Sequence, residues 1–140
     1  MRFWDSSALV ALLVEEPDTQ RRSAQLREDP VMAVWWATPV ECESAIQRRL
    51  REGALDSGGA RLARERLAEL AAAWHESPPQ PSLRPLATRL IRTHPLRAAD
   101  SLQLAAALTI CSALRREVGF VCADERIATA AEIENLPVIR

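Results

Sequence analysis

Apolar and polar residues alternate along the chain in the manner of short buried strands separated by amphipathic helices. The runs "RFW", "VMAVWWA", "VGFVCA" and "LPVI" are short and rich in β-branched or aromatic residues, as is typical of strands in a buried sheet. Between these runs, apolar residues recur every three or four positions, which predicts helices that pack one face against a core. From Leu96 onward the apolar positions fit a long buried helix, yet Asp100 stands inside that pattern.

This alternation of strands and helices is typical of an α/β fold in which helices flank a central parallel sheet, an α/β/α arrangement. A chain of 140 residues is long enough for one domain with a substantial core, so we expect a single domain over residues 1–140. The expected strands cover residues 2–4, 31–37, 118–123 and 136–139, and the expected helices cover 6–16, 17–29, 38–52, 61–74, 83–94, the segment from 96 onward and 125–133.

Two connecting segments and the start of one helix contain residues that predict a specific local structure. Residues 55–60, "LDSGGA", predict a turn, and residues 75–82, "HESPPQPS", predict a loop because their prolines lack the backbone donor of a strand. At the helix over residues 38–52, Thr38 fits the N-cap and Pro39 the first helical position. Glu41 then fits a capping box in which its carboxylate reaches back to the Thr38 amide.

Composition and charge narrow the class of protein. A hydrophobic share of 48% with 26% charged residues is ordinary for a soluble globular protein. The formal net charge is -1, so any contact with nucleic acid has to come from a local basic patch. All 18 basic residues are arginine, which suits bidentate phosphate binding but also fits a bias in base composition.

The cysteines and histidines exclude several kinds of site. The three cysteines (Cys42, Cys111 and Cys122) have no CxxC spacing, and neither histidine lies near one of them, which argues against a disulfide framework and a structural zinc site. The N-terminus does not resemble a signal peptide, and the longest apolar run is too short and interrupted to span a bilayer. We therefore expect a cytoplasmic protein with reduced thiols and no membrane association.

Four acidic residues differ from the others in where they fall. Asp5 and Asp124 each directly follow an expected strand and begin a helix, Glu41 lies one turn into the helix after residues 31–37, and Asp100 begins the helix before residues 118–123. The carboxyl ends of parallel strands share one edge of a sheet, where ligands bind. The pattern therefore predicts that these side chains converge.

Each of these acids also has a purely structural explanation. Asp5 and Asp124 can be helix N-caps, Glu41 can complete its capping box, and Asp100 can be favoured by the helix dipole. Together, however, two carboxylates about 4 Å apart repel by a few kcal/mol at a protein-like dielectric, so a cluster needs a proton or a cation. Mg²⁺ or Mn²⁺ suits an all-carboxylate site, and such an ion would explain why a carboxylate is tolerated at Asp100.

At these residues the sequence resembles a known family. The blocks "WDSSALVALL", "TPVECESAIQRR", "HPLRAADSLQLAAAL" and "FVCADERIATAA" closely resemble the four motif blocks of PIN-domain nucleases, in the same order and over nearly the whole chain. Among these nucleases they are most similar to VapC-type toxin ribonucleases of bacterial toxin–antitoxin pairs. The resemblance implies a single PIN-like domain and a catalytic, metal-binding quartet formed by Asp5, Glu41, Asp100 and Asp124.

The resemblance also implies roles for neighbouring residues. Ser7 is expected to help order the site by hydrogen bonding, whereas Glu43, two residues after Glu41, is turned away by helical geometry. Asp5, Asp100 and Asp124 are expected as direct or water-bridged metal ligands, and Glu41 as a ligand or as the residue that positions the attacking water. The candidates for RNA phosphate contacts, which equally fit a solvated helix face or internal ion pairs, are Arg48, Arg49, Arg51 and Arg97.

The implied function is a metal-dependent endoribonuclease that acts as the toxin of a type II toxin–antitoxin pair, with a cognate VapB-type antitoxin as partner. The alternative is a catalytically silent PIN-like module that binds RNA or protein. A receiver domain would need a lysine that the chain lacks, and a haloacid-dehalogenase-like phosphatase would need DxD where this chain has "DSS". A homodimer is expected because several apolar residues (Leu9, Leu12, Leu13, Trp35 and Trp36) exceed what one small sheet easily covers.

Overall fold

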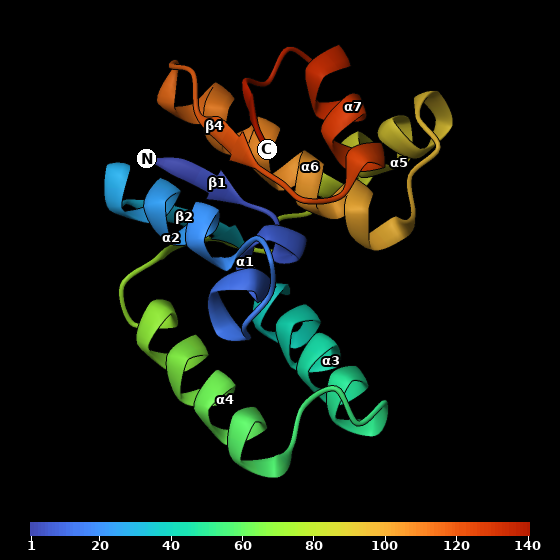
Figure 1. Ribbon diagram of the computed structural model, residues 1–140. Coiled ribbons are helices and arrows are strands. Elements are labelled where there is room, and N and C mark those ends of the chain that lie inside the picture. Colours follow the sequence, from blue (N-terminus) through green and yellow to red (C-terminus); the bar gives the residue numbers. More distant parts are fainter.

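Five short parallel strands form the centre of the structure, a computed structural model that describes residues 1–140 (Figure 1). They lie in the order β3-β2-β1-β4-β5, and all four neighbouring pairs are parallel. Parallel neighbours require crossover connections, and helices supply them along the chain. The strands are β1 (Arg2–Trp4), β2 (Met32–Trp35), β3 (His75–Ser77), β4 (Gly119–Val121) and β5 (Val138–Ile139).

Seven helices cover the two faces of this sheet. They are α1 (Ser6–Leu13), α2 (Thr19–Glu28), α3 (Thr38–Arg51), α4 (Ser57–Ala71), α5 (Leu83–Thr93), α6 (Ala98–Leu114) and α7 (Glu125–Ile133). Figure 1 shows α5, α6 and α7 on one side of the sheet and α1, α3 and α4 on the other. The expected α/β/α arrangement is therefore confirmed. None of the helices has the length and apolar character needed to cross a membrane.

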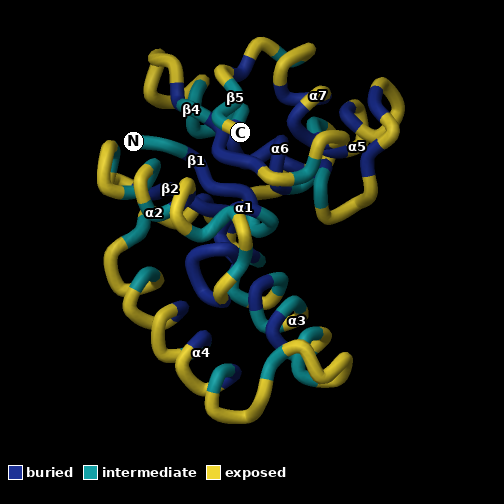
Figure 2. The backbone as a smooth tube through the Cα atoms, in the orientation of Figure 1, coloured by how far each residue is buried: buried dark blue, intermediate teal, exposed yellow.

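Two hydrophobic clusters, one on each face of the sheet, make up the core. Alternate residues of a strand point to opposite faces, so Phe3 joins a cluster of 19 buried residues and its neighbour Trp4 joins one of 15. The first cluster lies against α5, α6 and α7, and the second lies against α1, α3 and α4. In Figure 2 the sheet and α1 are largely buried, whereas α3 and α4 bury only their inner faces.

The leucines of α1 lie inside this second cluster, which corrects one expectation. Leu9, Leu12 and Leu13 were expected to need a second subunit, but they are only 0%, 3% and 7% exposed within one chain. The α3–α4 pair covers them, because α1 contacts both of those helices. Trp36 is different, with 52% of its surface exposed.

The strand β3 contradicts the loop expected for residues 75–82. It pairs with β2 through residues His75–Ser77 and ends directly before Pro78. As an edge strand it needs partners on one side only, and none of the prolines that follow has to donate a backbone hydrogen bond. The Trp36 amide extends this pairing by donating to the Ser77 carbonyl at 3.0 Å.

The start of α3 differs from the expected capping box. Ala37 occupies the N-cap in a helical conformation, and the buried Thr38 hydroxyl has no hydrogen-bond partner. This shift by one residue moves Glu41 out of the position from which it could reach the N-cap amide. The turn expected at residues 55–60 is also shorter, because α4 already begins at Ser57 with Asp56 as its N-cap.

Candidate active site

A polar cleft of about 530 Å³ lies where β1 and β4 end and where α3 and α6 approach them. The backbone amide of Asp5 donates to the Val121 carbonyl at 3.0 Å, which holds the ends of these two strands together. All four acids selected from the sequence line the cleft, together with serines and arginines. The lining residues are Asp5, Ser6, Ser7, Val10, Glu41, Ser44, Ala45, Arg48, Arg49, Arg97, Ala99, Asp100 and Asp124.

Asp5 is the buried acid of the cleft, with 3% of its surface exposed. It caps α1, because its Oδ2 accepts hydrogen bonds from the Ser7 amide, at 3.0 Å, and from the Ser7 hydroxyl. Burial raises the pKa of Asp5 to about 6, although these hydrogen bonds lower it, and the charges of Glu41 and Asp100 raise it further. The Ser7 hydroxyl also accepts from the Ala123 amide at 3.0 Å, so Ser7 fixes Asp5 to the end of β4.

Glu41 reaches the cleft from the first turns of α3. Its Oε2 accepts hydrogen bonds from the Ser6 hydroxyl at 2.6 Å and from the Gln103 amide at 2.9 Å. These donors come from α1 and α6, so the carboxylate joins three helices. This arrangement replaces the capping-box role and turns Glu41 toward Asp5.

Asp100 lies at the third position of α6, where it is half-buried. Asp100 can be a carboxylate in an otherwise apolar helix because it lies in the first turn of that helix. The helix begins only at Ala98, so Asp100 faces the cleft from the first turn and accepts from the Arg97 amide at 3.3 Å. The deeply buried carboxylate of the site is Asp5 instead.

Asp124 caps α7 and differs from the other three acids in its partners. Its Oδ1 accepts from the Arg126 backbone amide at 2.8 Å, and its Oδ2 forms an ion pair with the Arg126 guanidinium at 3.1 Å. The hydrogen bond from the Arg126 side chain is the main reason why the pKa of Asp124 is lowered from its usual value. Both carboxylate oxygens of Asp124 are thus engaged by one residue.

The other three acids each leave one carboxylate oxygen without a protein donor. Oδ2 of Asp5, Oε2 of Glu41 and Oδ2 of Asp100 accept all their hydrogen bonds, so the second oxygen of each is available. Hard divalent cations prefer such oxygen ligands, and the donor set therefore suits Mg²⁺ or Mn²⁺. No three His, Cys, Asp or Glu side chains are placed to hold an ion as they stand, so binding requires a side-chain rearrangement.

The four arginines that were candidates for phosphate contacts differ in their surroundings. Arg48 and Arg97 line the cleft, are exposed and form no ion pair. Arg49 also lines it but forms an ion pair with Glu16. Arg51 faces a different hollow, beside Pro39 and Val40.

Glu43 is directed away from the cleft, as helical geometry predicts. Its carboxylate pairs with Arg64 of α4 at 2.7 Å and accepts from Gln47 at 3.1 Å. Glu43 therefore provides a natural control for Glu41, which lies on the same helix.

Sequence reasoning missed three residues that touch the acids. Ser6 and Gln103 hold Glu41, and Arg126 holds Asp124. A signal existed for Gln103, because it follows Asp100 by three residues and is therefore on the same face of an otherwise apolar helix. No comparable signal distinguishes Ser6 from Ser7.

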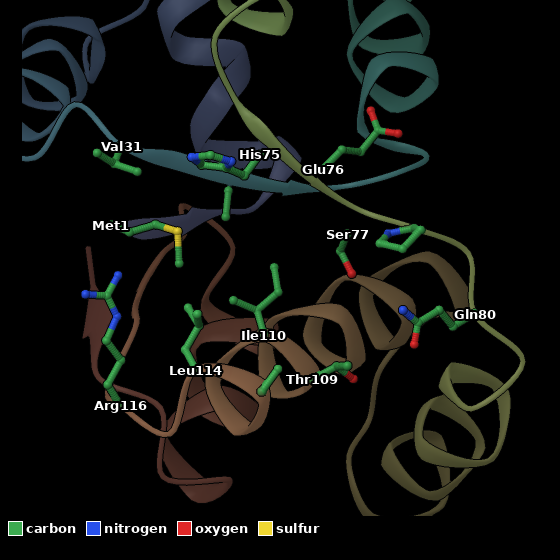
Figure 3. Close-up of a pocket in the computed structure, with 13 residues that line it drawn as sticks. Met1, Val31, His75, Glu76, Ser77, Gln80, Thr109, Ile110, Leu114 and Arg116 are labelled. Carbon is green, nitrogen blue, oxygen red and sulfur yellow. The ribbon is translucent and has the colours of Figure 1, made fainter.

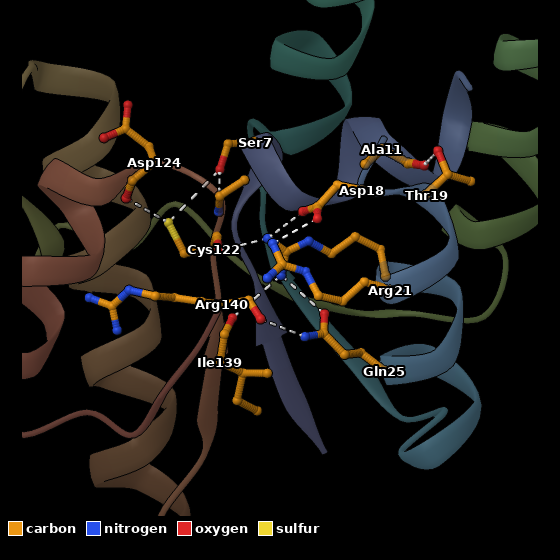
Figure 4. A network of polar contacts seen from close by, with 12 residues as sticks. Ser7, Ala11, Asp18, Thr19, Arg21, Gln25, Cys122, Asp124, Ile139 and Arg140 are labelled. Carbon is orange, nitrogen blue, oxygen red and sulfur yellow. Dashed lines mark hydrogen bonds and ion pairs between the residues drawn. The ribbon is translucent and has the colours of Figure 1, made fainter. Parts of the chain in front are cut away.

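A buried arginine connects α2 to the end of β4. Arg22 of α2 is fully buried, donates to the Cys122 carbonyl at 3.0 Å and pairs with Asp18 at 2.8 Å. Figure 4 shows the polar contacts around Asp18, Gln25 and Cys122. Cys122 also directs its thiol toward the Asp124 carbonyl at 3.2 Å. The segment that leads from β4 to Asp124 is thereby tied to α2.

A second hollow of similar size, about 520 Å³, lies between β3 and the C-terminal half of α6 (Figure 3). Its walls include Met1, Val31, Ile110 and Leu114, and Glu76 is its one acid. With a single carboxylate, this hollow lacks the cluster of acids that metal-assisted chemistry requires.

Comparison with solved structures identifies chains of the same architecture. FitAcB from Neisseria gonorrhoeae matches with a TM-score of 0.69 and 16% identity, covering 100% of this chain and 97% of the other. FitAB bound to IR36 DNA fragment matches at 0.67 and 16%, covering 99% and 94%. PAE2754 from Pyrobaculum aerophilum matches at 0.61 and 16%, covering 92% and 83%. At these identities the matches show a shared fold.

Comparison with protein families tests the resemblance of the four motif blocks directly. No curated protein matches the chain. The model of the PIN domain, in contrast, matches residues 2–133, which include all four acids of the cleft. The resemblance is confirmed over nearly the full length, and the chain belongs to the PIN-domain family.

Proposed function

We propose that the protein is a metal-dependent endoribonuclease that hydrolyses RNA phosphodiester bonds and acts as the toxin of a type II toxin–antitoxin pair. PIN-domain membership supports a nuclease. The observation that carries the proposal is the set of acids in the cleft, of which Asp5, Glu41 and Asp100 each keep one oxygen for a ligand.

The acids would divide the work according to their surroundings. Asp5, Asp100 and Asp124 would hold Mg²⁺ or Mn²⁺, and Glu41 would bind the ion or orient the attacking water through its unoccupied oxygen. Such an ion lowers the pKa of a water molecule and stabilises charge on the phosphate and the leaving oxygen. Ser7 fixes Asp5, while Ser6 and Gln103 fix Glu41, so that two of the carboxylates are held before any ligand arrives.

The arginines of the cleft would bind the RNA backbone. Arg48 and Arg97 are the proposed phosphate contacts, because both are exposed on the cleft walls and neither is paired with an acid. Arg49 is a weaker candidate because Glu16 already pairs with it, and Arg51 is directed elsewhere. The chain has no strongly basic face, so this local pair has to supply the attraction.

Two partners belong to the proposal. A VapB-type antitoxin is supported by the resemblance to VapC-type toxins, and the fold is also that of a chain solved in FitAB bound to IR36 DNA fragment. A homodimer is supported by Trp36 and Val40, which are 52% and 70% exposed near the start of α3.

One observation favours the alternative, a catalytically silent module that binds RNA or protein. Both oxygens of Asp124 are held by Arg126, and no three acids are placed to hold an ion as they stand. A silent module would bind RNA without cleaving it under any metal condition. The two functions therefore make opposite predictions for one assay.

The first prediction is that the purified chain cleaves RNA with Mg²⁺ or Mn²⁺ and that EDTA abolishes cleavage. Asp100→Asn should lower the rate by at least about 100-fold, because a metal ligand matters more than the residues that hydrogen-bond to the ligands, whose loss costs roughly 10- to 100-fold. Gel analysis of labelled RNA with and without metal measures both effects.

Glu43→Gln is the matched control for this assay. Glu43 is a carboxylate of α3 like Glu41, but it pairs with Arg64 outside the cleft, so its loss should leave the rate unchanged. Cleavage that persists in EDTA, or an active Asp100→Asn variant, would contradict the proposal. RNA binding without cleavage at any metal concentration would favour the silent module.

A further inference from the structure

Asp124, unlike the other acids of the cleft, has a protein partner on both of its carboxylate oxygens. Three of the acids leave a carboxylate oxygen available, whereas Asp124 gives Oδ1 to the Arg126 amide and Oδ2 to the Arg126 guanidinium. The amide contact is the N-cap of α7 and has a structural role. The guanidinium contact has no such role, because the cap is complete without it.

The guanidinium of Arg126 also lies where a second acid affects it. The hydrogen bond to Asp124 is the main reason why the pKa of Arg126 is raised, and the charge of Asp100 adds to it. A guanidinium that pairs with one acid of the cleft offsets part of the repulsion between the carboxylates, as a bound metal ion would.

We propose that Arg126 is a built-in competitor of the divalent cation: its guanidinium occupies the Asp124 oxygen that an ion would bind, and it has to leave that oxygen when the ion binds. This inference rests on the proposed function, since it takes Asp124 as a metal ligand. Its consequence is that the wild-type protein needs more Mg²⁺ or Mn²⁺ than the four carboxylates alone would require.

The expected size of the effect follows from the exposure of the ion pair. The side chains of Arg126 and Asp124 are 46% and 33% exposed, so the pair is screened by water. Exposed ion pairs are weak, and the displaced guanidinium also stays near the bound ion as a like charge. Removing the charge should therefore tighten metal binding by about three- to tenfold.

Calorimetric titration of Mn²⁺ into the full chain, without RNA, tests the competition. Arg126→Gln should bind Mn²⁺ about three- to tenfold more tightly than the wild type, and Arg126→Lys, which keeps the charge, should remain close to the wild type. Both variants keep the backbone amide that caps α7, so the helix should form normally. The matched control is Arg61→Gln, because Arg61 forms an exposed pair with Glu65 on α4 and does not line the cleft.

A double-mutant cycle assigns the effect to Asp124. If Arg126 acts by blocking this carboxylate, Arg126→Gln should give little gain in an Asp124→Asn background. An equal gain in both backgrounds would overturn the competition, as would unchanged affinity in Arg126→Gln beside a wild type that binds Mn²⁺. If neither protein takes up Mn²⁺, the proposed metal-dependent function fails, and the competition fails with it.

Discussion

At the scale of single residues, Asp5 shows how one side chain serves both the fold and the candidate site. One of its oxygens caps α1 through Ser7, and its position at the end of β1 buries it beside Glu41 and Asp100. Burial without a cation disfavours the charged form, which is why the pKa of Asp5 is raised to about 6. The ionised carboxylate therefore destabilises the metal-free protein.

This cost predicts a stability change with a defined pH dependence. An Asp5→Asn variant should be more stable than the wild type by about 3 kcal/mol at pH 7.5, because the unfolded protein ionises Asp5 near pH 4 and the folded protein near pH 6. Asparagine caps a helix as well as aspartate does. The gain should shrink as the pH falls from 6 toward 4, and denaturant unfolding without metal measures it.

Glu43→Gln should change the folding stability in the opposite direction. Arg64 lowers the pKa of Glu43, so this carboxylate stabilises the folded state at neutral pH and loses that effect in acid. The variant should therefore be slightly less stable at pH 7.5. A gain for Asp5→Asn that is the same at pH 4 and pH 7.5 would show that burial of the charge is not its cause.

At the scale of elements, α2 is connected to the sheet mainly by polar contacts. Its one buried residue is Arg22, which pairs with Asp18 and donates to the Cys122 carbonyl. The neighbouring Gln25 donates to the Arg140 carbonyl at 2.9 Å, beyond the end of β5. The helix is thus held against the ends of β4 and β5 (Figure 4).

Two adjacent arginines allow this connection to be tested. Arg22→Met should lower the free energy of unfolding by about 2 kcal/mol, because it leaves the Cys122 carbonyl without its buried donor and removes one of the two arginines that pair with Asp18. Arg21→Met removes an arginine that pairs with the same Asp18, but Arg21 is 53% exposed, so its loss should be below about 1 kcal/mol. Equal losses in thermal or denaturant unfolding would contradict the role given to burial.

At the scale of the whole molecule, each face of the sheet is closed by helices of the same chain. The leucines of α1 are covered by α3 and α4, so the interior of the monomer needs no second subunit. Among the large apolar side chains that remain exposed, Trp36 and Val40 lie close together in sequence near the start of α3. A homodimer would therefore use surface residues rather than complete an unfinished core.

The proposed homodimer makes a direct prediction for the mass in solution. Light scattering at micromolar concentration should give twice the 15.5 kDa of the chain, and Trp36→Ser should shift the population toward the monomer by removing the largest exposed apolar side chain. Leu62→Ser, which alters an exposed leucine of α4, is the control. A wild-type protein that is only monomeric would contradict the dimer.

The order of the elements other than β3, and the four acids that line the cleft, could be predicted from the sequence alone. Strands and helices differ in the period of their apolar residues, and this local signal survives without knowledge of the fold, so "ERIATAAEI" predicted α7 with its observed ends. Because the strands are parallel, acids placed after them had to share one edge, which brought Asp5 and Asp124 into one cleft. β3 was not predicted, because an edge strand of three residues is too short to show the period of a strand.

How these acids are held depends on packing between elements that are distant in sequence, and it could not be predicted. Glu41 could cap its own helix or accept hydrogen bonds from Ser6 and Gln103. Which of these it does depends on where α1 and α6 pack, and the local sequence does not predict that packing. The same holds for burial: Asp100 looked buried in an apolar helix, but the helix begins beside it, and the buried acid is Asp5. Side-chain partners far apart in sequence set charge and exposure, and those contacts exist only once the sheet and its two helical layers have assembled.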